Sequence, residues 1–497
     1  MGIHFITVLG TSLYTNCIYE IQEENFQWNT SYAQLAVLKY IESTGGKCDR
    51  ITVFVTEKSE KQNWVTREYT KSDQRILEKR QVEVKEGEVK TGLYEMMRAE
   101  FPDADIKGVR IKEGRNAEEI NEIFEAMYNA ILPEETIYFD FTHGLRNIPM
   151  QALTVIHYAK TLKNILVGGM YYGAFELGET KEDGILHVNL LDMSACSGIL
   201  DWTGAAESFI KSGSSNQIRT LYKNRVRPGR EQQYSTKTLD RLCDLTNCLN
   251  TSRGKVGGSA KGSIQTAYDY FKSNYDKMRS CDHQISEMPL LRLFDKIEAD
   301  VNMFGRVCCQ VKEDKKIVMK NTAAGMAAVE WAILKGLTQQ GFTALEETIK
   351  TYICEAYETP VEEELVRDTI VGRTIKFMAA QYNDARRKQR KSAESERLLP
   401  DIEKLIKGRR EELETDTWFK KLEDHEREFY LQKVEELIIS LPMELANLTS
   451  DVVRYRNTLN HFGFQKDEID YNKLQEQLHE LYEKLREIME KGQVVWE

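Results

Sequence analysis

Hydrophobic and polar residues follow two different patterns along this chain, and the change falls near residue 195. Before it, short apolar runs alternate with longer amphipathic stretches, which predicts strands and helices in turn. The expected strands cover residues 3–10, 51–55, 106–111, 137–141, 165–172 and 187–193. Helices are expected near residues 30–42, 71–83 and 149–162, and from residue 116 onward. This order predicts an α/β fold, with a mostly parallel sheet and helices on both of its faces.

After residue 195 the pattern is helical. Long polar stretches carry apolar residues at three- and four-residue spacing, which is typical of amphipathic helices. Only five prolines occur between residue 196 and the end of the chain. Because proline is poorly tolerated inside helices, this low number agrees with an all-α region.

One strand of the α/β part ends in a turn with candidate chemistry. The apolar run that starts at Ile137 breaks into Thr142, His143 and Gly144, and Arg146 and a helix follow. Ligand sites of open α/β sheets form at such strand ends. Backbone N–H groups at a helix N-terminus favour anions, and an arginine fork fits phosphate.

A second turn follows the same logic. The first strand ends at Gly10, and Thr11 and Ser12 come directly after it. Either turn alone also fits an ordinary strand–helix connection. Together they favour a ligand that carries phosphate, since two strand ends with glycine and hydroxyl groups can flank one crevice.

Composition places the chain among soluble globular proteins of two or three domains. It has 497 residues, of which 41% are hydrophobic and 30% charged. No apolar run reaches the roughly 20 residues of a membrane span, and no signal sequence is recognisable at the N-terminus, so a cytoplasmic protein is expected. The nine cysteines contain no Cys-x-x-Cys pair, which favours reduced thiols over disulfides or zinc. The net charge of −11 argues against sequence-independent coating of nucleic acid, while a local site for a short RNA segment stays possible.

The C-terminal region holds a second candidate site. Arg456 is followed five residues later by His461 on a predicted helix that ends near Gly463. Asn457 shares a helical face with His461, whereas Arg456 lies about 140° around the helix from it. An arginine and a histidine at this spacing also occur by chance on surface helices, so the pattern alone does not assign a function.

Several segments of the first 195 residues resemble one known family. They are FDFTHGLRNIP, the GTS after the first strand, VFVTEKSEKQNW and YYGAFE. In this order they resemble the CARF sensor domain of the accessory proteins of type III CRISPR systems. The resemblance implies that the domain binds a cyclic oligoadenylate. The residues expected to line its pocket, on the axis of a dimer, are Thr11, Ser12, Thr142, His143, Gly144 and Arg146.

The C-terminal motif resembles a second part of the same protein family. RNTLNHFGF looks like the catalytic motif of HEPN ribonucleases, and it lies behind a CARF-like sensor as in CARF–HEPN proteins. The resemblance implies that Arg456 and His461 are catalytic and that Asn457 supports them. The expected fold is a Rossmann-like α/β CARF domain, an all-α region and a C-terminal HEPN domain. Their expected ranges are 1–195, 196–345 and 346–497.

The chemistry expected of this motif is metal-independent cleavage of single-stranded RNA. The 2′-hydroxyl of RNA is the nucleophile, a histidine transfers protons, and an arginine stabilises charge on the phosphate. Products then carry a 2′,3′-cyclic phosphate. No carboxylate cluster accompanies the motif, so no metal and no cofactor besides the activating cyclic oligoadenylate are expected. One chain supplies half of a composite site, which predicts a homodimer.

Two other functions stay open. The chain could be a CARF sensor whose HEPN domain only dimerises or contacts a partner. It could also be a nucleotide- or dinucleotide-dependent enzyme, although the first turn lacks the glycine-rich dinucleotide fingerprint. The sequence does not indicate the ring size of the activator, the RNA sequence that is cut, or whether the sensor degrades its ligand.

Overall fold

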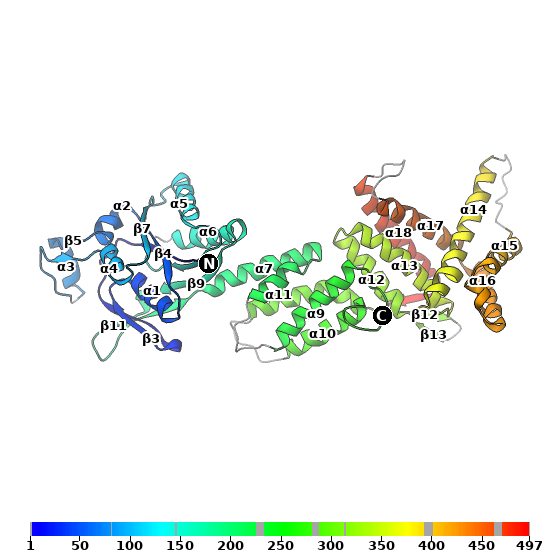
Figure 1. Ribbon diagram of the computed structural model, residues 1–497, viewed down its shortest axis with the longest axis horizontal. Helices are drawn as coiled ribbons and strands as arrows, with labels where there is room; N and C mark the ends of the chain where they lie inside the picture. The colour runs from blue at the N-terminus through cyan, green and yellow to red at the C-terminus, as the bar shows by residue number, and fades with distance from the viewer. Residues whose placement is uncertain are drawn as a thin grey trace. The chain divides into compact units, whose positions relative to one another are not determined.

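The computed structural model describes residues 2–80, 82–144, 147–224, 233–280, 288–312, 315–391, 401–461 and 470–496. Contacts within the chain divide it into two compact units, Met1–Leu200 and Asp201–Glu497. Figure 1 colours the first unit blue to teal and the second green to red. Each unit is described separately below.

A nine-stranded sheet forms the centre of the first unit. Its strands pair in the order β3-β2-β11-β9-β8-β1-β4-β7, and β10 pairs with β11. The strands are β1 (Ile3–Leu9), β2 (Cys17–Ile21), β3 (Phe26–Thr30), β4 (Cys48–Val55), β7 (Asp105–Arg110), β8 (Thr136–Asp140), β9 (Leu166–Gly173), β10 (Glu179–Thr180) and β11 (Leu186–Asp192). A separate two-stranded sheet pairs β5 (Arg67–Glu68) with β6 (Val89–Lys90).

The α/β prediction for this unit is confirmed, and the sheet is mixed. Strands β7, β4, β1, β8 and β9 are parallel neighbours. Strand β11 is antiparallel to both β9 and β10. Strand β2 is antiparallel to β3, with which it forms a hairpin. The sequence analysis missed this hairpin. Its turn is marked by Asn25, which adopts the left-handed conformation that asparagine tolerates.

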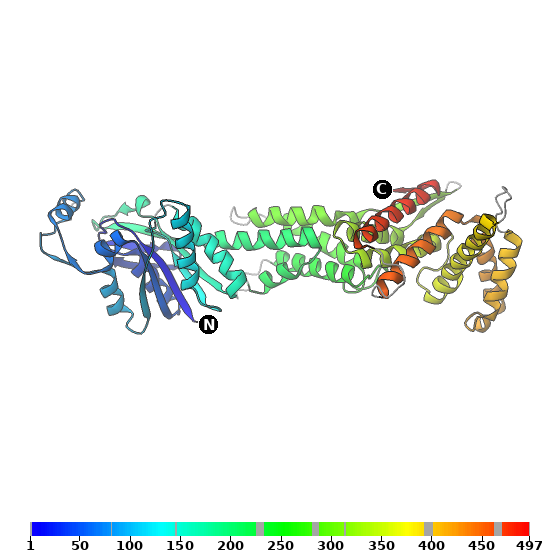
Figure 2. The ribbon, with the colours of Figure 1, turned by 90° about the horizontal axis from the view of Figure 1, so that it is seen from above.

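Helices cover both faces of the sheet, and successive buried residues of its central strands point to opposite faces. On β1, Phe5 packs in a core with α1 (Ala33–Ser43) and α4 (Leu93–Glu100). The next residue, Ile6, packs in a second core with α5 (Ala117–Ala130) and α6 (Ile148–Lys163). Figure 2 shows the unit from above. This two-sided burial makes the central strands continuous apolar runs, as parallel sheets require.

The predicted start of α5 is confirmed. The Asn116 side chain accepts a hydrogen bond of 2.8 Å from the N–H of Glu119. Shorter helices that precede it are α2 (Glu57–Ser59) and α3 (Lys71–Glu78). The Asn116 bond satisfies one of the N–H groups that every helix leaves free at its first turn.

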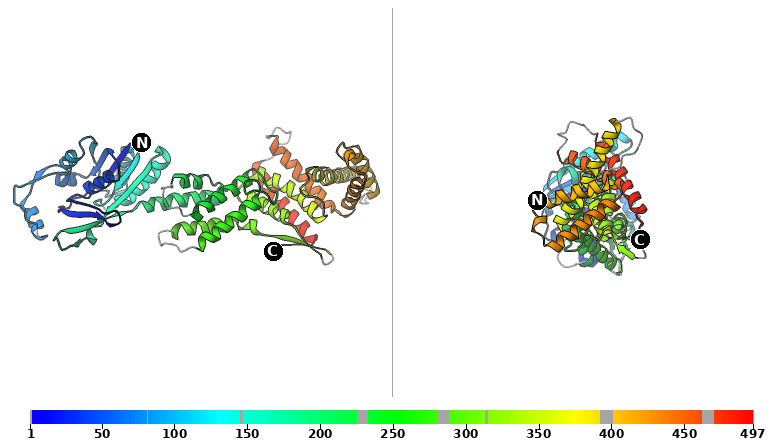
Figure 3. Two further views of the ribbon diagram at one scale, coloured as in Figure 1. Left: turned by 60° about the horizontal axis from the view of Figure 1, so that its bottom comes forward. Right: turned by 90° about the vertical axis from the view of Figure 1, so that its right-hand side faces the viewer.

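The second unit is largely helical. Its helices are α7 (Ser194–Ser212, which begins in the first unit), α8 (Asn216–Asn224), α9 (Gln233–Asn250), α10 (Ile264–Arg279), α11 (Met288–Val301), α12 (Lys320–Leu334), α13 (Thr338–Ala356), α14 (Arg373–Lys391), α15 (Ile402–Thr415), α16 (Asp424–Ser440), α17 (Met443–Asn460) and α18 (Tyr471–Lys491). Figure 3 shows these helices from two further sides. Among the residues that the structure describes, no helix is long and apolar enough to cross a bilayer.

The prediction of an all-α region is wrong in one detail. A three-stranded sheet of order β13-β12-β14 is formed by β12 (Cys308–Lys312), β13 (Lys315–Val318) and β14 (Val494–Trp496). The pairing of β12 with β14 joins residues almost 190 positions apart, for example Cys308 with Trp496. Local periodicity carries no signal for such a distant partner, although β-branched residues are enriched in these strands.

A pH-dependent contribution to stability follows from His187 on β11. Its Nδ1 lies 3.0 Å from Glu20 Oε2 and its Nε2 lies 3.0 Å from Asp183 Oδ2. Lys181 also binds Glu20, at 2.9 Å. The bonds to Asp183 and Glu20 raise the pKa of His187 above its ordinary value of 6.5. Their stabilisation is therefore fully present below that value and is lost as the pH rises through the raised pKa.

We expect His187→Gln to lower the thermal unfolding midpoint more at about pH 5.5 than at about pH 8.5, because the charged imidazole is lost. Thermal melts followed by circular dichroism measure this difference. His425→Gln is the control, since the side chain of His425 is 77% exposed. An equal effect of His187→Gln at both pH values would contradict the assignment.

Candidate functional site

Three parallel strands end side by side at one edge of the first sheet. In the register of the sheet, Leu9 lies beside Val55, and Thr7 lies beside Asp140. The segments that follow β1, β4 and β8 therefore emerge at the same edge. The carboxyl ends of parallel strands are where ligands of such folds bind.

The buried carboxylate of Asp140 holds the turn after β8. Asp140 is fully buried and accepts hydrogen bonds from the Thr7 hydroxyl (2.7 Å), the Thr142 N–H (3.1 Å) and the Thr142 hydroxyl (2.5 Å). The Thr142 hydroxyl also accepts a 2.8 Å bond from the N–H of Gly173. Burial raises the pKa of Asp140, and these bonds oppose that rise. The Thr142 hydroxyl is thus committed to the shape of the turn.

The two turns singled out in the sequence touch each other. A Cβ atom at Gly10 would lie 2.7 Å from the carbonyl oxygen of His143 and 2.6 Å from the hydroxyl of Tyr14. Such distances are too short for any side chain, so the approach requires glycine. The structure therefore brings Gly10, Thr11 and Ser12 together with the turn that carries His143. The side chains of Thr11 and Ser12 are exposed.

His143 is half-buried. Its ring packs on the ring of Tyr14 with centroids 4.2 Å apart. Within the described part of the chain, its Nε2 atom is buried without a hydrogen-bond partner. Burial lowers the pKa of His143 to about 4, so the ring is neutral at neutral pH. Gly144 follows it in the same turn, and its N–H bonds to the carbonyl of Phe141 at 3.4 Å. Arg146 lies outside the described residues.

Asn63 is a residue of this site that the sequence analysis did not name. It is fully buried, and its Nδ2 donates to the carbonyl oxygens of Gly10 (2.8 Å) and Ser12 (2.9 Å). Its Oδ1 accepts a 2.5 Å bond from Lys90 Nζ, which also bonds to the carbonyl of Gln62 at 2.8 Å. Burial, more than any neighbouring charge, lowers the pKa of Lys90 to about 8. Asn63 belongs to VFVTEKSEKQNW, one of the segments that resemble the CARF domain. That membership was the signal in the sequence that could have drawn attention to it.

The second candidate site lies at the end of α17. Arg456 Nη1 donates to Asn457 Oδ1 at 3.2 Å, so the structure brings these two residues together. His461 follows the helix as its C-cap, is exposed, and its N–H bonds to the carbonyl of Asn457 at 2.9 Å. Among the described residues, no hydrogen bond or ion pair joins the side chains of Arg456 and His461.

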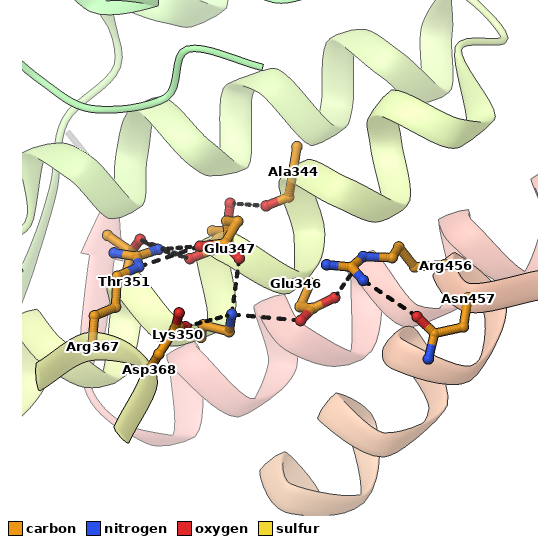
Figure 4. Close-up of polar contacts among 10 residues, drawn as sticks. Ala344, Glu346, Glu347, Lys350, Thr351, Arg367, Asp368, Arg456 and Asn457 are labelled. Atoms are coloured by element: carbon orange, nitrogen blue, oxygen red, sulfur yellow. Dashed lines mark hydrogen bonds and ion pairs between the residues drawn. The ribbon is translucent and has the colours of Figure 1, made fainter. Parts of the chain in front are cut away.

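Arg456 instead pairs with a buried carboxylate of α13. Its Nε lies 3.1 Å from Glu346 Oε2, and the Glu346 side chain is only 3% exposed (Figure 4). Lys350 Nζ lies 3.5 Å from the other oxygen of Glu346. The sequence analysis missed Glu346. Its position in the sequence could have revealed it as a buried carboxylate, because Glu346 falls on the same helical face as the apolar residues Phe342 and Ile349, which are both buried.

In the part of the chain that the structure describes, no group of three or more histidine, cysteine, aspartate or glutamate side chains is placed to hold a metal ion. Metal independence of any reaction stays a prediction, because it concerns chemistry that this observation does not test.

Comparison with known proteins gives matches within the first unit. Residues 4–176 match the model of the family described as CRISPR system endoribonuclease Csx1, CARF domain. A CRISPR-associated protein of Methanocaldococcus jannaschii is 30% identical over 117 residues, which are 23% of this chain. The aligned part covers 18% of the length of that relative. These findings support a CRISPR-associated protein with a CARF domain. The residues of the family match end before the second unit begins.

The clamp formed by Asn63 yields a prediction about the first site. Asn63→Ala leaves the Gly10 and Ser12 carbonyls without their donor, so unfolding free energy should fall by about 1–3 kcal/mol. Amide hydrogen exchange at Thr11 to Leu13 should become faster. Urea titration and exchange measured by mass spectrometry test both effects.

Gln62→Ala is the matched control, because the Gln62 side chain makes a long 3.5 Å bond to Asp73 and, among the described residues, no side-chain hydrogen bond to the turn after β1. Unchanged exchange at residues 11–13 in Asn63→Ala would show that the clamp does not hold this turn.

Proposed function

We propose that this chain is a CRISPR-associated endoribonuclease that a cyclic oligoadenylate activates allosterically and that cuts single-stranded RNA without a metal. The observation that carries the sensor half is the CARF family match over residues 4–176. The observation that supports the nuclease half is the group formed by Arg456, Asn457 and His461 at the end of α17.

The edge of the sheet suits a phosphate-bearing ligand. Thr11 and Ser12 expose their side chains beside the turn that carries His143. Helix α6 begins after this turn, and its N-cap residue, Asn147, makes no side-chain cap. Uncapped N–H groups and the positive end of the helix dipole attract anions. In this proposal Thr142 shapes the turn through Asp140, and Thr11, Ser12, His143 and Gly144 contact the ligand. Arg146 stays a predicted contact, because it lies outside the described residues.

The C-terminal group suits cleavage by the RNA's own 2′-hydroxyl. An imidazole transfers protons near neutral pH, and an exposed His461 has room to reach a substrate. The guanidinium of Arg456 stabilises charge that develops on the phosphate. We infer that a second copy of the chain adds a second such group, so that a two-fold dimer forms one composite site.

One observation favours the alternative, a sensor whose helical unit only dimerises or contacts a partner. Among the described residues, no hydrogen bond or ion pair joins Arg456 to His461. RNase activity measured with and without activator separates the two functions.

The sensor predicts a defined ligand. Titration calorimetry against cyclic oligoadenylates of different ring sizes should reveal binding to one of them. His143→Ala, Arg146→Ala and the double variant Thr11→Ala/Ser12→Ala should weaken that binding, because they remove pocket groups. They should also raise the activator concentration that RNA cleavage requires.

Thr154→Ala is the matched control for the sensor, since the exposed Thr154 bonds to the Met150 carbonyl within α6. Full-strength binding in both His143→Ala and Arg146→Ala would place the pocket elsewhere in the molecule.

The reaction predicts the ends of the products. If the 2′-hydroxyl attacks, fragments carry a 2′,3′-cyclic phosphate and a 5′-hydroxyl, EDTA does not inhibit, and RNA with a 2′-deoxy residue at the cut resists cleavage. His461→Ala and Arg456→Ala should each lose roughly 100-fold or more in rate while ligand binding persists. End-group analysis and gel-based rate measurements provide the test.

Arg454→Ala is the matched control, since Arg454 lies on the same helix, is exposed, and pairs with Asp451 at 3.4 Å. Products with 5′-phosphate and 3′-hydroxyl ends would mean that water attacked, and the roles given to Arg456 and His461 would have to be withdrawn.

A further inference from the structure

We propose that Glu346 is a positioning residue, which holds the guanidinium of Arg456 in the orientation needed at a scissile phosphate. This inference rests on the proposed function, because it assigns Arg456 a role in RNA cleavage. It adds a residue from a different helix, 110 positions before Arg456, to the site.

The first argument is burial. The side chain of Glu346 is 3% exposed and lies on the face of α13 that packs in the core of the second unit. Burying a carboxylate costs free energy unless a cation compensates it. Helices α13 and α17 pack against each other, with the rings of Phe342 and Tyr455 5.6 Å apart. Arg456, on the neighbouring helix α17, supplies one compensating cation.

The second argument is that Arg456 is the closest cation to Glu346. Lys350 lies 3.5 Å from Glu346, but it is closer to Glu347 (2.9 Å) and to Asp368 (3.2 Å). Figure 4 shows Lys350 between these three carboxylates, while Arg456 contacts Glu346 from the other side. Arg456 thus makes the shorter contact with Glu346, whereas Lys350 interacts with three carboxylates at once.

The third argument is the geometry of the fork. Glu346 Oε2 lies 3.1 Å from Nε of Arg456 as an ion pair, although among the described residues it accepts no hydrogen bond, and Asn457 accepts a hydrogen bond from Nη1. Among the described residues, no hydrogen bond engages Nη2, and the Arg456 side chain is 32% exposed. The guanidinium is therefore paired with Glu346 at Nε and hydrogen-bonded to Asn457 at Nη1, and Nη2 keeps its donors for a phosphate. A guanidinium that is already oriented by these partners can stabilise charge in the transition state without first changing its own position.

The test combines two readouts on four proteins: wild type, Glu346→Gln, Arg456→Ala and the double variant. In activated RNA cleavage, Glu346→Gln should lower kcat roughly 10- to 100-fold and leave KM for RNA nearly unchanged, because it misorients a group that acts in the transition state. In thermal melts, Arg456→Ala should lower the midpoint, and adding Glu346→Gln should restore part of the loss, because the buried charge is then gone.

Glu347→Gln is the matched control. Glu347 is the next residue of α13 and pairs with Lys350 and Arg367, not with Arg456, so its variant should cleave RNA at close to the wild-type rate. A Glu346→Gln protein with wild-type or higher kcat would overturn the positioning role, as would purely additive effects on the melting midpoint. A wild-type protein that cleaves no RNA would instead refute the proposed function, while the melting cycle would still report whether the pair forms in solution.

Discussion

The buried carboxylate of Asp140 is the constraint on which the N-terminal site depends. Among the described residues, its hydrogen bonds come from hydroxyl and amide donors of Thr7 and Thr142, and no lysine or arginine bonds to it. Such a group is costly to bury, so its hydrogen bonds must be well formed. Together they tie β1 to the turn after β8, and the Thr142 hydroxyl extends the tie to Gly173 on β9. The position of His143 beside Gly10 follows from these bonds.

Around this turn, the site is built from long-range contacts of backbone and buried polar groups. Asn63 fixes the opposite side by binding two carbonyls of the β1 turn, and Lys90 in turn fixes Asn63. Buried polar groups of this kind rigidify a site when every partner is present. Thr11 and Ser12 thus lie on a turn whose backbone is hydrogen-bonded to Asn63 and packs against the turn that carries His143.

The sequence predicted those features that depend on local pattern. The parallel strands were recognisable as apolar runs, the start of α5 as an asparagine before Glu119, and the paired turns as glycine with hydroxyl residues. The hairpin β2–β3 and the sheet β12–β13–β14 were missed, because their pairing is set by tertiary contacts. Glu346 was missed for the same reason, since its partner Arg456 lies in another helix. The motif predicted that Arg456 and His461 act together, although their spacing puts them about 140° apart around the helix, and among the described residues no side-chain bond joins them.

In the proposed nuclease, the pairing of Arg456 with Glu346 limits how a ligand bound to the first unit can regulate RNA cleavage. A ligand shifts a conformational equilibrium only by the difference in its affinity for the two states. Withdrawing the partner of a fully buried carboxylate costs about 3–5 kcal/mol, and less here because Arg456 is 32% exposed. A rearrangement that keeps α13 and α17 packed together avoids this cost. We therefore expect activation to change how the paired helices of two copies meet, with each Arg456 held by its own Glu346 throughout.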